Sequence, residues 1–201
     1  MSIKITEPLP DSVEIVTSTD RILKQFSQLC EHRHTPIGMT ERSRNYHFYW
    51  PKPPLATRAL PGGSASLDAE DGYDYADRLF SFFTKASLGD LYFWAIGNPE
   101  IGVFRGEFSY EIAWWVRRNI IVTPTVLLSG SGDFVMISDE QWHISVIGAP
   151  HETITTLENE FGGAQCLKRN FLNYSEKGFV GFGAEGTDWA YKYPIEWCGW
   201  S

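Results

Sequence analysis

The segment 126–148 constrains the fold of this chain more than any other part of the sequence. It contains three apolar stretches, 126–128, 134–138 and 141–148, separated by short segments rich in Ser, Gly and Asp. In the last stretch, apolar residues alternate with polar ones, which is the period of a strand with one buried face. Tight turns between short strands connect neighbouring antiparallel strands. The segment therefore predicts a β-meander.

A second alternating pattern lies just before the meander. Phe104, Phe108, Tyr110, Ile112, Trp114 and Val116 occupy alternate positions and have mostly polar residues between them. This pattern predicts one long, half-buried antiparallel strand that is bent at Gly106. Residues 91–96 are apolar on both faces, so we expect a central strand there.

Three other segments carry apolar residues at helical spacing. We expect a first helix from Thr19 or Asp20 to about His34, a second over 73–86, and a third that begins at Pro150 and stops at Gly162. The Pro- and Gly-rich residues 51–72 are typical of a long connection, and we expect residues 165–201 to form irregular or short-stranded segments.

This order of elements predicts an α+β fold, with a mostly antiparallel sheet and helices packed on one of its faces. A length of 201 residues fits a single domain over 1–201. No apolar run reaches the roughly 20 residues that span a bilayer, and the N-terminus resembles no signal peptide. Three widely spaced cysteines suit a reducing compartment. We therefore expect a cytoplasmic protein without membrane association.

The net charge of −8 is concentrated in two segments that lack Lys and Arg. The first lies between Arg118 and Lys168 and the second over 59–77, and together they hold eleven Asp and Glu residues. Such a surface repels phosphate backbones, which argues against direct binding of nucleic acid. It would attract a basic protein. The alternative is that these acids form a solvated face that only keeps the protein soluble.

Several short patterns resemble cofactor or metal sites but fail on inspection. The glycines of 181–186 match a dinucleotide fingerprint, yet too few residues follow for the helix and strand that it requires. The acids of 68–74 do not fit the register of a calcium loop, and the turn 129–133 has no helix after it to bind phosphate. On a helix, Cys30, His32 and His34 would not share one face. We therefore expect neither a cofactor nor a metal.

Two features remain as candidate functional groups. His143 and Ser145 share a strand face, with Asp139 or Glu140 at the preceding turn, but no oxyanion hole or nucleophile elbow accompanies them. A surface histidine is the favoured interpretation, so we expect no enzymatic activity. Trp115 would face outward from the long strand, where a partner could bury it, or it could pack under a helix or the long connection.

Over roughly 89–201, the chain resembles bacterial immunity proteins, the small neutralisers encoded beside polymorphic or type VI secreted toxins. The resemblance lies in an acidic, aromatic-rich α+β domain and in the turn Gly132-Asp-Phe that leads to Ser138-Asp-Glu-Gln-Trp-His. The terminal Trp197-Cys-Gly, close after Tyr193, is similar to the Trp-x-Gly motif and Tyr–Cys pair of the α+β immunity family paired with restriction-endonuclease-fold toxins.

The resemblance implies a protein that binds a cognate toxin, a nuclease being one candidate, and blocks it by occupying its basic groove. The partner is then a protein toxin with a basic surface, and the expected contacts are Asp133, Asp139, Glu140, His143, Glu158, Glu160, Asp68, Glu70, Asp71 and Trp115. Two alternatives stay open: a non-catalytic interaction or regulatory module, and a small enzyme that uses His143.

Overall fold

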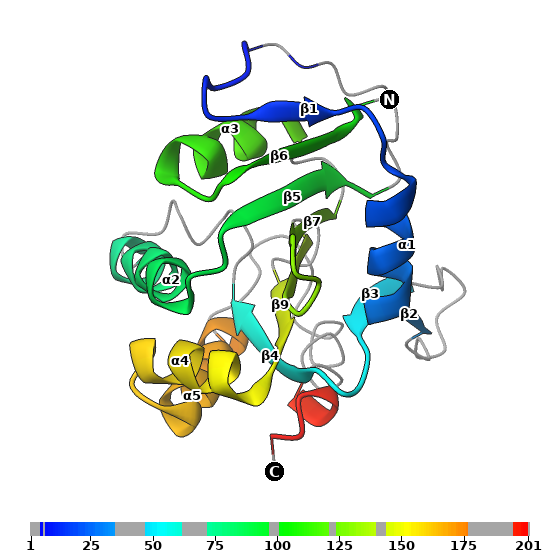
Figure 1. Cartoon of the computed structure of the whole chain (residues 1–201). Helices are drawn as coiled ribbons and strands as arrows, with labels where there is room; N and C mark the ends of the chain where they lie inside the picture. Colours follow the sequence, from blue (N-terminus) through cyan, green and yellow to red (C-terminus); the bar gives the residue numbers. More distant parts are fainter. Residues whose placement is uncertain are drawn as a thin grey trace, which may run out of the picture.

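A seven-stranded antiparallel sheet organises the protein, as the computed structural model shows for residues 5, 7–34, 47–61, 72–96, 101–120, 124–139, 144–176 and 195–200 (Figure 1). The strand order is β1-β6-β5-β7-β8-β9-β4. The strands are β1 (Glu14–Val16), β4 (Ala56–Pro61), β5 (Asp90–Ala95), β6 (Val103–Glu107), β7 (Thr125–Ser129), β8 (Val135–Asp139) and β9 (Ile144–Ala149). A separate hairpin pairs β2 (Cys30–His34) with β3 (His47–Pro51).

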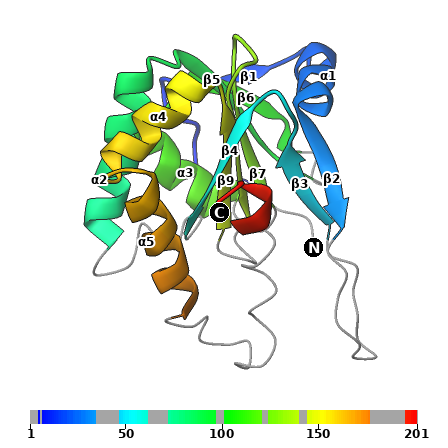
Figure 2. The same cartoon turned by 90° about the horizontal axis from the view of Figure 1, so that it is seen from below.

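Helices cover both faces of the sheet, but unequally. One face carries α2 (Gly72–Ala86), α3 (Tyr110–Ile120), α4 (His151–Glu160) and α5 (Ala164–Glu176). The other face carries α1 (Asp20–Leu29) and the β2–β3 hairpin (Figure 2). The predicted α+β class with a mostly antiparallel sheet is confirmed. Of the helices α1 to α5, four share one face, as expected, and α1 is the exception.

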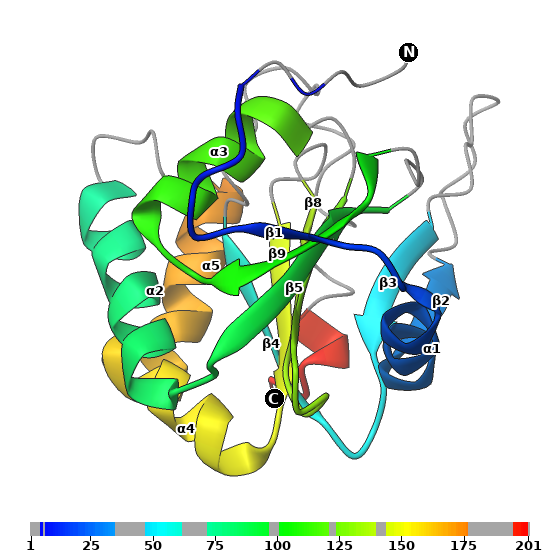
Figure 3. The same ribbon diagram turned by 45° about the horizontal axis from the view of Figure 1, so that its top comes forward.

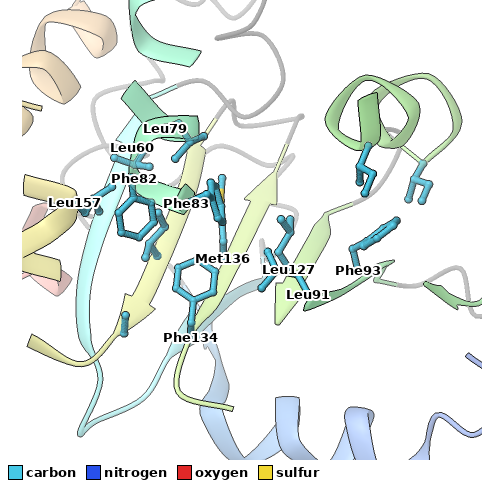
Figure 4. Close-up of a cluster of buried hydrophobic side chains, with 14 of the residues drawn as sticks. Leu60, Leu79, Phe82, Phe83, Leu91, Phe93, Leu127, Phe134, Met136 and Leu157 are labelled. Carbon is cyan, nitrogen blue, oxygen red and sulfur yellow. The ribbon is translucent and has the colours of Figure 1, made fainter. Parts of the chain in front are cut away.

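The main core lies between the sheet and the four-helix face (Figure 4). Phe82 and Phe83 of α2 meet Phe134, which lies between β7 and β8, at ring-centre distances of 6.1 and 5.8 Å. On the opposite face, Phe26 of α1 packs edge-on against Trp94 of β5 at 5.3 Å. Because both faces are covered, β5, β7 and β9 are apolar almost throughout, with β7 and β9 buried at every position.

The meander is confirmed. Strands β7, β8 and β9 lie within one or two residues of the predicted stretches wherever those residues are described; 140–143 lie outside the described part of the chain. Ser129 explains the tightness of the first turn, because its Oγ accepts hydrogen bonds from the N–H groups of Gly132 and Phe134 at 3.2 and 3.1 Å. Predictions for 73–86, 91–96 and the helix after Pro150 also match α2, β5 and α4 closely.

The single long strand predicted over 104–116 is wrong. Only β6 is extended, and α3 begins at Tyr110. Ser109 Oγ accepts a hydrogen bond from the N–H of Ile112 at 3.2 Å, which is the contact of a helix N-cap. The buried residues Ile112, Trp115 and Asn119 are three and four apart, as one face of a helix requires.

Three other predictions need correction. The first helix ends at Leu29, because Cys30 begins β2 and pairs with Pro51 of β3. Within the expected connection 51–72, β4 pairs with β9 along its whole length. Residues 164–176 form α5 instead of an irregular segment, while 177–194 lie outside the described residues.

Candidate partner-binding site

The acid of the meander turn, Asp133, organises its own loop. Its side chain is exposed, and its Oδ1 accepts hydrogen bonds from the hydroxyls of Ser129, at 3.0 Å, and Ser131. The turn itself rests on α1, since a Cβ on Gly132 would lie within 1.7 Å of the Gln25 side chain. Asp133 therefore faces solvent while holding the turn in shape.

Most of the other contact residues predicted on the meander and the long connection lie outside the described part of the chain. Glu140, His143, Asp68, Glu70 and Asp71 lie outside the described residues, and of Asp139 only the backbone, at the end of β8, is described. Ser145 lies on β9, where its hydroxyl meets that of Ser138 at 2.9 Å. The interpretation of His143 as an exposed residue or a catalytic one stays a prediction.

The two acids of α4 that were predicted as contacts, Glu158 and Glu160, hold the helix to its neighbours. Glu158 Oε1 contacts the Nε and Nη2 atoms of Arg58 on β4, each at 2.6 Å, and the side chains are only 15% and 20% exposed. Glu160 contacts Lys85 Nζ of α2 at 2.5 Å. Hydrogen bonds from Lys85 and then Ser81 hold the pKa of the Glu160 carboxyl below its usual value. Both carboxylates are thus neutralised inside the fold.

The prediction that Trp115 faces outward as an anchor is also wrong. Trp115 lies on α3, is 4% exposed, and packs edge-on against Phe104 of β6 at 5.1 Å. Its indole Nε1–H donates a hydrogen bond to the backbone oxygen of Pro8 at 2.8 Å. The change from strand to helix explains the difference, because a helix turns Trp115 and Ile112 toward the sheet together.

That hydrogen bond belongs to a segment that runs along α3, residues 7–13, which we call the N-terminal strap (Figure 3). Near the end of α3, the N–H of Glu7 donates to Asn119 Oδ1 at 3.2 Å, and the Glu7 carboxylate pairs with Arg118 at 2.9 Å. Near the start of α3, the backbone oxygen of Ser12 lies so close to β6 that a Cβ on Gly106 would approach it to 2.9 Å. The strap therefore lies antiparallel to α3.

Between the strap and α3 lies an open hollow of about 760 Å³, which we call the acidic hollow. Its charged residues are Glu7, Asp11, Glu111 and Arg118, three carboxylates against one guanidinium. Asp11 and Glu111 are exposed and form no ion pair with another described residue. The remaining lining residues are Pro8, Leu9, Pro10, Ser12, Trp114 and Trp115.

More carboxylates lie on the strands beside the hollow. Arg105 of β6 pairs with Glu14 of β1 at 2.9 Å and with Asp90 of β5 at 2.7 Å. The Glu14 hydrogen bond and the nearby Asp90 charge raise the pKa of the Arg105 guanidinium. Glu107 is exposed, lies opposite Asp90, and forms no ion pair within the described part of the chain. Among the described side chains, carboxylates therefore outnumber bases at this end of the sheet.

A second cavity, of about 610 Å³, lies on the other face between α1, the hairpin and the sheet. Phe26, Tyr49 and Trp94 form aromatic walls, and the His32 ring lies 4.0 Å from that of Tyr49. Burial raises the pKa of the Cys30 thiol to about 12, so this thiol stays protonated at neutral pH.

Cys30, His32 and His34 lie on strand β2 and not on a helix. Because alternate residues of a strand share one face, the expectation that these three residues would not share a face was wrong. Within the described residues, however, no group of three or more His, Cys, Asp and Glu side chains is arranged to hold a metal ion.

Comparisons with protein-family models, curated proteins and solved structures found no match to this chain. No helix in the described part of the chain has the length and apolar character needed to cross a membrane. Of the residues that line the acidic hollow, Trp115 was singled out from the sequence, and the charged ones were missed. Asp11 and Glu111 are 100 positions apart, and the two local signals were the Pro8-Leu-Pro-Asp11 turn and the Ser109 cap of α3.

Proposed function

We propose that this protein is a cytosolic immunity protein that binds a cognate toxin with a basic surface, such as a nuclease, and blocks it by occupying its groove. The observation that carries the proposal is the acidic hollow. There, Asp11 and Glu111 line the same hollow as Trp114, which is partly buried. The resemblance to immunity proteins in the second half of the chain supports the same conclusion.

The chemistry of the hollow suits a cationic side chain. A Lys or Arg from the partner would find two carboxylates that no base of the described chain neutralises, and an indole ring beside them. Arg118 already lies over the Trp114 ring, 6.0 Å from its centre, so this indole accommodates a guanidinium. Carboxylate and aromatic groups of this kind fix the register of an interface and speed association with a basic partner.

Binding of this kind inhibits without chemistry. A toxin that acts on a polyanion needs an exposed basic groove, and a negatively charged protein seated in that groove excludes the substrate. The net charge of −8 adds long-range attraction, which salt screens beyond about 10 Å at 0.1 M. The proposal therefore predicts a complex that weakens as the salt concentration rises.

Growth rescue tests the proposal. The reading frame next to this one is expressed in a heterologous host, alone and together with this protein. We expect the neighbour to stop growth, the wild-type protein to restore it, and the Asp11→Lys/Glu111→Lys variant to restore it poorly. Glu152→Lys is the matched control, because Glu152 is an exposed acid on α4, away from α3. A toxic neighbour that this protein neither binds nor neutralises would refute the proposal.

A further inference from the structure

Strand β1 has one edge that no other described strand pairs with. β1 pairs with β6 on one side and is the last strand of the sheet in the described chain. Its Ile15 is 57% exposed, more than any other large hydrophobic side chain among the described residues. An edge strand carries N–H and C=O groups that point away from the sheet and can pair with another chain.

The opposite edge of the same sheet is covered. Helix α5 packs on β4, whose Ala59 and Leu60 are fully buried. The C-terminal turn also closes over this edge, with Cys198 buried and its backbone oxygen accepting a hydrogen bond from Arg58 Nη1 at 3.3 Å. Within the described part of the chain, the fold thus protects the β4 edge, and no strand pairs with the outer edge of β1.

The charges around β1 select the occupant of this edge. Among the described side chains, five carboxylates and one guanidinium lie close to its first residue, those of Asp11, Glu14, Asp90, Glu107, Glu111 and Arg105. A second copy of the chain would bring the same negative charges to the shared edge. Since β1 has only three residues, these charges would meet within the roughly 10 Å Debye length at 0.1 M salt. A basic segment is attracted instead.

We propose that an extended, basic segment of the partner adds to β1 as a further strand of the sheet. The inference rests on the proposed function and names how the partner docks. Ile15 lies opposite Phe104, whose side chain faces α3, so both side chains lie on the same face of the sheet. Every second side chain of the added strand would lie on this face, next to Ile15. Backbone hydrogen bonds supply affinity in this mode, and the carboxylates near Glu14 select Lys or Arg on the added strand.

Hydrogen exchange and a charge on the edge test the inference, with the toxin domain encoded by the neighbouring frame as the probe. We expect complex formation to slow at least one outward amide of residues 14–16 by about tenfold or more. Ile15→Lys places a like-signed ammonium against the basic strand and should weaken binding by about tenfold or more. Leu23→Lys, at an exposed position on α1, should change affinity by less than about twofold.

The outcomes separate the two proposals. A complex that forms with unchanged exchange at 14–16 and equal affinity for the Ile15→Lys variant overturns strand addition and leaves the proposed function standing. Absence of any complex overturns the proposed function and, with it, the docking mode. Concentration-dependent dimerisation of the isolated protein that Ile15→Lys abolishes assigns the edge to a second copy and also overturns the inference.

Discussion

Replacing Glu158 by glutamine removes the charge that joins α4 to β4. In the folded protein, Glu158 Oε1 accepts hydrogen bonds from Arg58 Nε and Nη2, and the two side chains are 15% and 20% exposed. Arg58 also donates to the backbone oxygen of Cys198 and lies over the ring of Trp200, 5.9 Å from its centre. The variant leaves this guanidinium without its carboxylate in a mostly dry position.

The burial of the pair sets the size of the effect. Exposed ion pairs contribute about 0–1 kcal/mol, whereas removing one partner of a fully buried pair costs about 3–5 kcal/mol. Because this pair is largely but not completely buried, we expect Glu158→Gln to lower the free energy of unfolding by about 2 kcal/mol. For a chain of this size, that loss corresponds to a decrease in Tm of about 4–8 °C.

Urea denaturation followed by tryptophan fluorescence, together with thermal scans, measures the change. Glu152→Gln serves as the matched control on the same helix, where an exposed carboxylate should matter by less than about 0.5 kcal/mol. Arg58→Met, alone and combined with Glu158→Gln, completes a double-mutant cycle, in which the coupling energy should be about 1–2 kcal/mol.

The opposite pattern would refute this reasoning. If Glu158→Gln leaves the unfolding free energy within about 0.5 kcal/mol of wild type but weakens the complex with the toxin, Glu158 belongs to the interface and not to the fold. The prediction from sequence that Glu158 contacts the partner would then be correct, and the ion pair with Arg58 would not stabilise the fold.

Three further predictions follow from individual contacts. Gly148→Ala should cost about 1–3 kcal/mol, because a Cβ there would lie 2.3 Å from Pro51 Cβ, while Gly130→Ala, with no contact under 3.8 Å, should be nearly neutral in the same urea titration. A thiol reagent at pH 8 should label Cys166 alone in the native protein, because burial raises the pKa of Cys30 and Cys198 to about 12; rapid native labelling of either would contradict this. Lys85 keeps the pKa of the Glu160 carboxyl below its usual value of 4.5, so this group adds stability above pH 4.5 that is lost as the pH falls through the lower pKa of the folded state. The variant Lys85→Met should therefore reduce the loss of stability at acid pH. An unchanged loss would count against the contact between Lys85 and Glu160.

Local patterns in the sequence were enough to predict the centre of the fold. The meander, α2, β5 and α4 each combine one clear period with a turn or cap residue, so local preference and tertiary packing agree. Tyr110 to Val116 fits both a period of two and a helical spacing, and only the Ser109 cap distinguishes them. For β2, the deciding interaction is its pairing with β3, a segment farther along the chain that no window around Cys30 contains.

The candidate site was less predictable because charge along a sequence is not charge in space. Glu158 lies in a long segment without Lys or Arg, yet it pairs with Arg58, which lies on a strand 100 positions away in the sequence. Conversely, Asp11 and Glu111 lie in segments with nearby bases and meet in one hollow only because the strap follows α3. Both results depend on the fold and not on local composition.

The dissociation constant of the complex with the neighbouring toxin domain, measured by calorimetry at low and high salt, tests the central claim most directly. We expect tight binding at low salt that weakens with added salt, a loss of about tenfold or more for Asp11→Lys/Glu111→Lys, and no loss for Glu152→Lys. Equal affinity of all three proteins, independent of salt, would contradict the assignment of the acidic hollow as the binding site.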